Sequence, residues 1–186
     1  MVLAMNKSEI IMKAIFLVNH QGLSSLTISK LAKELNVKPP SLYKHIQSLN
    51  QIHDELGMVF MKGVIQLIQT NAFGLSGEKA LKEFCNSFRM YSLENPGLYQ
   101  AMQLTHVIRS KQYQEIANSL LELLGRVLVS FQIQKHRQTD AIRFLRSVLH
   151  GFIDLEIHNG FGLPEDINNS FELAMEACIL SLSKIY

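Results

Sequence analysis

The spacing of apolar residues predicts helices along almost the whole chain. In residues 8–20, apolar side chains recur every three or four positions, which is the period of one face of an α-helix, and Ser8 is the expected N-cap. The pattern recurs after each break marked by glycine, proline or asparagine. The buried stripe expected for the first helix is Ile11, Ala14, Ile15 and Val18. The pattern predicts about nine helices in all. They cover residues 8–20, 27–35, 39–46, 49–70, 78–94, a short one ending near 103, 111–134, 138–159 and 165–185.

The second and third of these helices predict a helix-turn-helix. Thr27 is placed to cap the helix over 27–35, and Asn36 tolerates the left-handed backbone of a tight turn. Pro39 and Pro40 come next, and prolines suit the first turn of a helix because its N–H groups have no partner there. A short second helix after a tight turn is the helix-turn-helix arrangement.

The outer face of the helix over 39–46 is polar and aromatic. Leu42 and Ile46 are four residues apart and are expected to face inward. The outward side chains include hydrogen-bond donors and a cation, which suit phosphate oxygens and the acceptors of the major groove. The alternative interpretation is a solvated polar helix. The residues concerned are Pro40, Ser41, Tyr43, Lys44 and His45.

Composition and charge change this picture in two ways. Of 186 residues, 47% are hydrophobic and 18% charged, which is enough apolar material for a packed core. Residues 1–50 hold six lysines and two glutamates, a net charge of +4, whereas residues 51–186 carry −2. A basic N-terminal part suggests a polyanionic partner, although a solvated basic face is the alternative. No membrane span or signal segment is predicted, so we expect a soluble, cytoplasmic protein.

No pattern of residues indicates catalysis or a cofactor. Cys85 and Cys178 lie in apolar helical patterns and are expected to be buried free thiols. His150, Asp154 and His158 have a spacing that metal ligands also use, but no further convergent ligand can be placed. We interpret them as polar positions of a helix, and we expect neither an enzyme nor a metal site.

Two segments resemble the TetR family of bacterial transcriptional regulators. The match is strongest in residues 8–56, where "LTISKLAKELNVKPPSLYKHI" is similar to that family's second helix, turn and recognition helix. Residues 145–179 are similar to the C-terminal helix pair of the subgroup called WHG, and "NPGLY" (95–99) also fits it. Residues 103–135 are weakly matched.

The resemblance implies an all-α fold with a three-helix DNA-binding domain in residues 1–47, joined to a larger effector-binding and dimerisation domain in residues 48–186. It implies a homodimer that binds a palindromic DNA operator, usually as a repressor, and that an unknown small-molecule effector releases. The chain departs from many relatives at Leu49, where they have a phosphate-binding lysine, and at Lys44, where many have an aromatic or another residue. The DNA contacts that it implies are Thr27, Lys38, Pro40, Ser41, Tyr43, Lys44 and His45.

It also implies a pocket and a dimer face in the second domain. Methionine and aromatic residues at helical spacing usually form core, but in this family the core encloses a ligand. The expected pocket residues are Met58, Met61, Phe84, Phe88, Tyr91, Met102 and His106. The expected dimer residues are Leu145, Val148, Leu149, Phe152, Phe171, Met175, Cys178 and Leu182. The alternative function is a ligand- or partner-binding helical protein that binds DNA without base selectivity.

Overall fold

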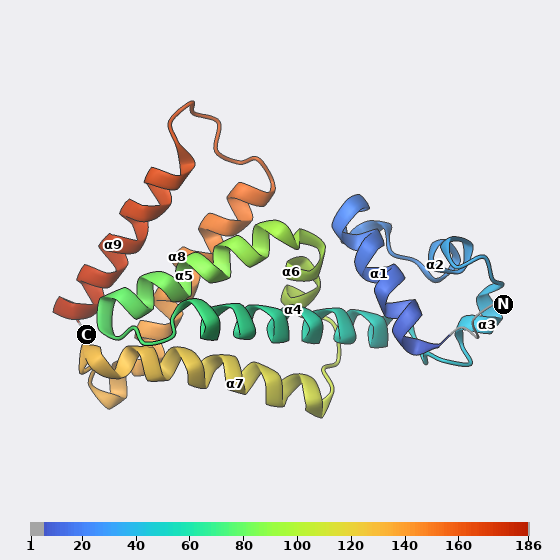
Figure 1. The fold of residues 1–186 in the computed structure, drawn as a ribbon, viewed down its shortest axis with the longest axis horizontal. Helices are drawn as coiled ribbons and strands as arrows, with labels where there is room; N and C mark the ends of the chain where they lie inside the picture. Colours follow the sequence, from blue (N-terminus) through green and yellow to red (C-terminus); the bar gives the residue numbers. More distant parts are fainter. Residues whose placement is uncertain (1–5, 186) are drawn as a thin grey trace. The chain divides into compact units, whose positions relative to one another are not determined.

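The computed structural model describes residues 6–185, and within them the chain is entirely helical, as predicted (Figure 1). It contains no strand in this range. The elements are α1 (Lys7–Gln21), η1 (Leu23–Ser25), α2 (Ile28–Glu34), α3 (Pro39–Leu42), α4 (Leu49–Asn71), α5 (Gly77–Glu94), α6 (Pro96–Gln103), α7 (Lys111–Leu128), η2 (Val129–Phe131), η3 (Lys135–Arg137), α8 (Gln138–Ile157) and α9 (Ile167–Ile185). No helix among the described residues has the length and apolar character needed to cross a membrane.

The chain divides into two compact units. Unit 1 comprises Met1–Gly63 and Glu94–Asn118, and unit 2 comprises Val64–Leu93 and Ser119–Tyr186. Unit 1 therefore combines α1 to α3 with the first part of α4, with α6 and with the start of α7. The predicted division into residues 1–47 and 48–186 separates the chain by function, whereas these units separate it by compactness. The functional division stays a prediction.

The first helix begins earlier than predicted. Asn6, not Ser8, is its N-cap: the Asn6 side chain accepts from the Glu9 N–H at 3.0 Å, and the Glu9 carboxylate accepts from the Asn6 N–H at 3.3 Å. This reciprocal pair satisfies two N–H groups that the first turn leaves without partners. The buried stripe of this helix is rotated by about one residue relative to the predicted stripe. Neighbouring positions are both apolar, so either could fit the helical period. It consists of Ile10, Ala14, Leu17 and Val18, while Ile11 and Ile15 are half-buried.

The ends of α7 and α8 and the start of α9 also differ from the predicted boundaries. Helix α7 ends at Leu128 rather than near 134, and the chain turns at Gln132, which is left-handed with φ 53°. Helix α8 ends at Ile157, where Asn159 has φ 53° and the Gly160 N–H donates to the Leu155 carbonyl at 2.7 Å. This bond satisfies one of the last carbonyls of α8 in a Schellman-type end. Helix α9 starts at Ile167 rather than at the predicted 165.

The start of α6 is fixed to α1 within unit 1. The Asn19 side-chain oxygen accepts from the backbone N–H of Gly97 at 3.1 Å and of Leu98 at 3.3 Å, so a residue of α1 caps α6. A Cβ at Gly97 would lie 2.3 Å from the backbone carbon and oxygen of Val18. Only glycine allows the two backbones to approach this closely.

In unit 2, an ion pair joins α5 to α8 at the edge of an aromatic cluster. The Arg89 guanidinium donates to both carboxylate oxygens of Glu156, at 2.7 and 2.5 Å, and to the Asn168 side-chain oxygen at 3.0 Å. It also lies 4.6 Å from the centre of the Phe171 ring. Two parallel N–H···O bonds and a ring contact hold this planar cation in one orientation.

Both cysteines are free and buried, as predicted. Burial raises the pKa of the Cys85 thiol to about 12, and the nearby Cys178 adds to the effect. Burial also raises the pKa of Cys178. Thiols kept protonated in an apolar core are unreactive, so both act as small core residues.

Candidate nucleic-acid interface

The turn between α2 and α3 forms as predicted. The Thr27 hydroxyl oxygen accepts from the Lys30 N–H at 3.2 Å, which caps the start of α2. At the other end Asn36 has φ 55°, and the Val37 N–H donates to the Ala32 carbonyl at 2.9 Å. The left-handed residue reverses the chain, so that α3 starts directly after α2.

Helix α3 is shorter than the predicted helix over 39–46. It covers Pro39–Leu42 and continues as a turn through His45. The Leu42 carbonyl accepts from the N–H groups of both His45, at 2.9 Å, and Ile46, at 3.0 Å. A carbonyl shared in this way tightens the last turn and ends the regular α-helix.

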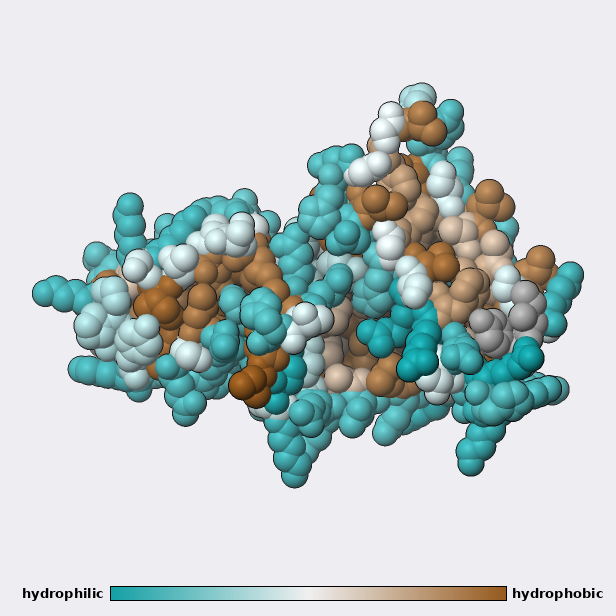
Figure 2. All heavy atoms as spheres, turned by 180° about the vertical axis from the view of Figure 1, so that it is seen from behind, coloured by the Kyte–Doolittle hydropathy of each residue, from teal (hydrophilic) through white to brown (hydrophobic). Residues whose placement is uncertain are grey.

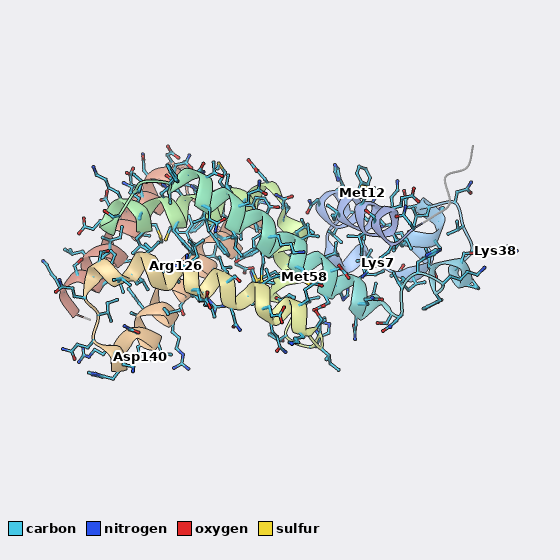
Figure 3. The ribbon with its side chains drawn as sticks, turned by 60° about the horizontal axis from the view of Figure 1, so that its bottom comes forward. Lys7, Met12, Lys38, Met58, Arg126 and Asp140 are labelled. Atoms are coloured by element: carbon cyan, nitrogen blue, oxygen red, sulfur yellow. The ribbon has the colours of Figure 1, made fainter. Side chains whose placement is uncertain are left out.

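Two buried anchors set which side chains of this segment face outward. Leu42 is 0% exposed and Ile46 is 2% exposed, so both belong to the core of unit 1, as predicted. Ser41 is half-buried. The other predicted DNA contacts are exposed, and Figure 3 shows Lys38 extending away from the helices of its unit. These exposed residues are Thr27, Lys38, Pro40, Tyr43, Lys44 and His45.

The prolines decide how this segment can hold an anion. Pro39 and Pro40 occupy the first two positions of α3 and have no N–H, while the Ser41 N–H donates to the Lys38 carbonyl at 2.9 Å. A helix start normally offers free N–H groups to phosphate, but this one offers none in its first two residues. Any anion contact here must come from side chains.

The exposed lysines of this segment are free to supply that contact. Among the described residues, Lys38 and Lys44 make no ion pair, whereas Lys7 in the same unit is paired with Glu55. Uncompensated cations beside hydroxyl and phenol donors attract polyanions over several ångströms of solution.

The start of α4 carries no cation. The Ser48 hydroxyl oxygen accepts from the Gln51 N–H at 3.2 Å, and the Gln51 side-chain oxygen accepts from the Gln47 N–H at 2.7 Å. Leu49 is half-buried. Uncharged groups therefore cap this helix.

The predicted pocket residues fall into both units, and none of them lines either of the two cavities found in unit 2. His106 is exposed, and Tyr91 and Met102 are half-buried. Their role as pocket residues stays a prediction. The buried members are Met58 and Met61 in unit 1, and Phe84 and Phe88 in unit 2.

Six of the eight predicted dimer residues lie inside a single chain. Only Val148 and Phe152 are half-buried rather than buried. A side chain that its own chain already covers offers no surface to a second copy. These six residues therefore lie on the inward face of the two helices, and the dimer contact itself stays a prediction. The six buried residues are Leu145, Leu149, Phe171, Met175, Cys178 and Leu182.

The three polar residues of α8 with metal-like spacing do not converge. Burial and the charge of Arg146 lower the pKa of His150 to about 4, and the edge of its ring meets Phe88. His158 Nδ1 lies 2.8 Å from the Asp154 backbone oxygen in the last turn of the same helix. Within residues 6–185, no group of three or more potential ligands is placed to hold a metal ion.

The sequence interpretation missed a polar cluster in unit 1. Arg109 donates to the backbone carbonyls at the end of α6, its guanidinium lies 4.1 Å from the Tyr113 ring centre, and it is 3.9 Å from the Asp54 carboxylate. The Ser110 N–H also donates to Asp54, at 3.3 Å. These groups join α4, the end of α6 and the start of α7. The three carbonyls are those of Ala101 at 2.9 Å, Met102 at 3.0 Å and Leu104 at 2.9 Å.

A signal for this cluster was present in α4. Asp54 lies four and seven residues before Met58 and Met61, and all three are buried. A carboxylate on an apolar stripe predicts a buried charge that needs a cationic or N–H partner. The identity of that partner, Arg109, had no such signal because it lies in an irregular segment. Next to Asp54, burial and the charges of His106 and Arg109 lower the pKa of His53.

Comparison with known proteins identifies the family. A profile described as the tetracyclin repressor-like, C-terminal domain matches residues 81–178. A Bacillus subtilis (strain 168) protein named as an uncharacterized HTH-type transcriptional regulator, YobS, is 25% identical over 181 residues, which cover 97% of this chain and 94% of that protein.

Solved structures show the same fold. BioQ with its natural double-stranded DNA operator superposes with a TM-score of 0.71 and 17% identity, over 97% of this chain and 99% of that one. A variant of TetR from Acinetobacter baumannii AYE, in complex with minocycline, has a TM-score of 0.71 and 20% identity, over 98% of both chains. With the C-terminal match covering more than half of its length, the chain belongs to the TetR family of transcriptional regulators, as its sequence predicted.

Proposed function

We propose that this regulator binds a two-fold symmetric DNA operator as a homodimer and represses transcription until a small-molecule effector releases it. The observation that carries the proposal is the outward face of α3 and its following turn. Leu42 and Ile46 fix this segment to the core, and polar, aromatic and cationic side chains are left exposed on its other side. BioQ, which has the same fold, is known in complex with its operator.

The exposed side chains divide by chemistry into two groups. Lys38 and Lys44 are unpaired cations and suit phosphates, which position the protein on the duplex. Ser41, Tyr43 and His45 carry directional donors that suit base edges in the major groove. These roles follow from chemistry and exposure.

Thr27 and Pro40 complete the proposed interface. The Thr27 oxygen accepts from the Lys30 N–H, so its own O–H remains available to donate to a phosphate oxygen. Pro40 is exposed and apolar, and its ring suits contact with a thymine methyl.

We place the dimer contact on the outward faces of α8 and α9. Each of these faces carries a stripe of apolar and small residues. On α8 the members of the stripe are separated by four, three and four residues, and the spacing on α9 is similar. This is the repeat seen in helices that pack in a bundle. Figure 2 shows hydrophobic side chains exposed over the α8–α9 connection and the adjoining helices. The α8 stripe is Phe144, Val148, Gly151 and Leu155, and the α9 stripe is Leu173, Ala177 and Leu180.

Exposure and small residues support this face. Leu173 is 68% exposed and Leu180 is 53% exposed, and exposed apolar residues that share one helix face mark a site of interaction. Gly151 and Ala177 leave room for a second helix to approach closely. The variant Leu173→Glu/Leu180→Glu is therefore expected to sediment as a monomer, and a dimeric variant would contradict the assignment.

An effector would act through its different affinities for two arrangements of the dimer. In one arrangement the spacing of the two DNA-binding segments does not match the operator. A ligand that binds this arrangement more tightly lowers DNA affinity, at most by the difference between its binding free energies for the two arrangements. The Acinetobacter TetR variant is known with minocycline, but the effector of this chain is to be found by experiment. We keep residues 1–47 as the DNA-binding domain and residues 48–186 as the effector and dimer domain. A DNA-binding role places the protein in the cytoplasm.

The test is a selection of random duplex DNA on the purified protein, followed by binding of the winners at several salt concentrations. An enriched palindrome bound by a dimer is the expected result, and it supplies the sequence and the assay for effectors. Binding that depends steeply on salt but shows no enriched sequence would contradict the proposal. The chain would then be a ligand- or partner-binding protein with a generic basic surface.

A further inference from the structure

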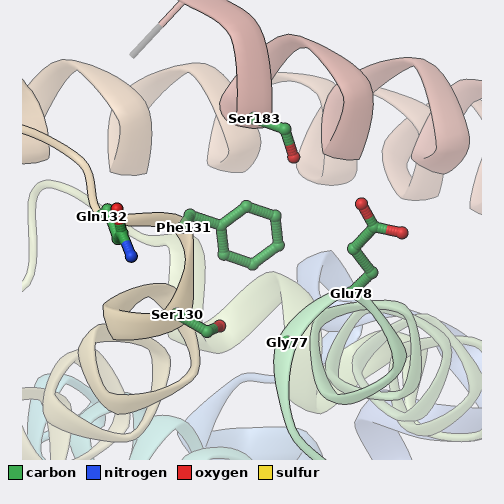
Figure 4. A pocket seen from close by; sticks show the side chains of 6 residues that line it. All are labelled: Gly77, Glu78, Ser130, Phe131, Gln132 and Ser183. Carbon is green, nitrogen blue, oxygen red and sulfur yellow. The ribbon is translucent and has the colours of Figure 1, made fainter.

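A cavity of about 250 Å³ lies in unit 2, where the start of α5, the segment after α7 and the end of α9 meet (Figure 4). Neither the proposed DNA contacts nor the proposed dimer face uses it. Its lining combines one aromatic ring, one carboxylate and several neutral polar groups. The lining residues are Gly77, Glu78, Ser130, Phe131, Gln132 and Ser183.

The ring and the carboxylate face the same space. Figure 4 shows the Phe131 ring at the centre of the cavity and the Glu78 side chain reaching in from the first turn of α5. Phe131 is half-buried, so its backbone and neighbours hold the ring in place. Among the described residues, Glu78 makes no hydrogen bond or ion pair. A carboxylate without a partner beside an aromatic face is the arrangement that attracts organic cations.

The charge of the lining supports this preference. Among the six lining residues, Glu78 is the one that carries a charge, and the others are neutral. A cation in the cavity therefore meets a carboxylate and no opposing cation of the lining.

The neutral polar groups of the lining are acceptors as well as donors. The Ser130 hydroxyl donates to the Val127 carbonyl at 3.1 Å, which leaves its oxygen free to accept a hydrogen bond. An ammonium or guanidinium group brings N–H donors, whereas a phosphate or carboxylate ligand would bring only acceptors and a charge that Glu78 repels.

We propose that this cavity binds a small organic cation of the ammonium class, held between the Phe131 ring and the Glu78 carboxylate. The site lies in unit 2 and needs no DNA, so it stands apart from the proposed operator binding. The cation sits on the face of the ring, and the carboxylate neutralises its charge from the other side.

The experiment titrates the purified full chain, without DNA, by calorimetry or by NMR chemical shifts. The probe is choline, and its matched control is the uncharged isostere 3,3-dimethyl-1-butanol, which has the same shape without the charge. Inorganic phosphate serves as the anionic control. Saturable binding of choline, with the isostere weaker by about tenfold, is the expected result. Equal binding of choline and isostere, tighter binding of phosphate, or no saturable choline binding up to about 10 mM would overturn the proposal.

Three variants connect the binding to this cavity. Glu78→Gln is expected to weaken choline by about tenfold, and Phe131→Leu by about threefold to tenfold. Glu94→Gln removes a carboxylate from the opposite end of the same helix and should change nothing. Glu78 is exposed, so its variant should fold normally, which far-ultraviolet circular dichroism checks. Unchanged choline affinity in Glu78→Gln would place the cation elsewhere and refute the site.

Discussion

Two sets of cations in unit 1 contrast in how they are compensated. Lys38 and Lys44, beside α3, are exposed and make no ion pair among the described residues. Arg109 is only 13% exposed in its side chain, donates to four backbone carbonyls, stacks on Tyr113 and lies near Asp54. A cation that its own chain has satisfied stabilises the fold, whereas one left in solvent is available to a partner. Substitutions at the two places should therefore affect different measurements.

The largest effect is expected at Arg109. Replacing Arg109 with alanine removes the donors to four carbonyls and leaves the Asp54 charge buried with one N–H donor from Ser110. Breaking such an arrangement should lower the free energy of unfolding by about 3 kcal/mol, measured by urea denaturation. The matched control Arg126→Ala removes an arginine that is 76% exposed, and it should change the free energy by less than about 0.5 kcal/mol.

A loss below about 1 kcal/mol in Arg109→Ala would break the comparison, because the cluster would then contribute no more than a surface pair. A loss of DNA affinity in a variant that keeps its full stability would also contradict it. In that case Arg109 would belong with the binding cations rather than with the structural ones.

The next largest effect concerns His150, which the folded chain holds in its neutral form. Burial and the charge of Arg146 lower the pKa of His150 to about 4, from about 6.5 in the unfolded chain. The unfolded state therefore takes up this proton at higher pH than the folded state does. The free energy of unfolding therefore does not depend on this histidine above about pH 6.5, and it decreases as the pH falls from 6.5 toward 4.

The variant His150→Leu should lose less stability between pH 7 and pH 5 than the parent chain, by about 2 kcal/mol. Urea denaturation at the two pH values measures the difference. Ser147→Ala, on the same helix but without a titratable side chain, should keep the parent's pH dependence. Identical pH dependence in His150→Leu and the parent would mean that His150 titrates normally.

Much of the fold follows from local sequence chemistry. The Thr27 cap, the left-handed Asn36 and the paired prolines each need only near neighbours to act, and each is where the sequence placed it. The phase of α1 depended on packing instead, because adjacent apolar residues there fit the same helical period. The end of α3 depends on the Leu42 carbonyl, which two local N–H groups share, and no residue type in the segment signals this.

The candidate sites divide in the same way. The outward face of α3 was readable because two buried anchors, Leu42 and Ile46, fix the orientation of everything between them. The outward face of α8 and α9 was not readable, because both helices are apolar on two sides and periodicity alone does not say which side faces its own chain. Asp54 signalled a buried charge in α4, but its partner Arg109 was not readable, because Arg109 lies in an irregular segment where no period places its side chain.

On the exposed side of the comparison, Tyr43 should carry the largest share of operator affinity. It is 55% exposed, so Tyr43→Ala should leave stability unchanged and weaken binding to the selected operator by about 1–3 kcal/mol. Fluorescence anisotropy measures the affinity. Phe73→Ala, which removes an aromatic ring that is 88% exposed in unit 2, is the matched control. Unchanged affinity in Tyr43→Ala would remove this residue from the interface.

The smallest effect should come from Lys44, and it has a distinctive form. As an exposed cation placed for phosphate, Lys44→Ala should weaken operator and unrelated duplexes alike, by about 1 kcal/mol, and reduce the slope of log affinity against log salt by about 1. Lys62→Ala removes an exposed lysine of α4 in the same unit and should leave the slope unchanged. If Lys44→Ala instead relaxed the preference for one base pair and kept the slope, Lys44 would contact a base edge. The uncompensated cations beside α3 would then be readers of sequence, and charge alone would no longer explain why they are left unpaired.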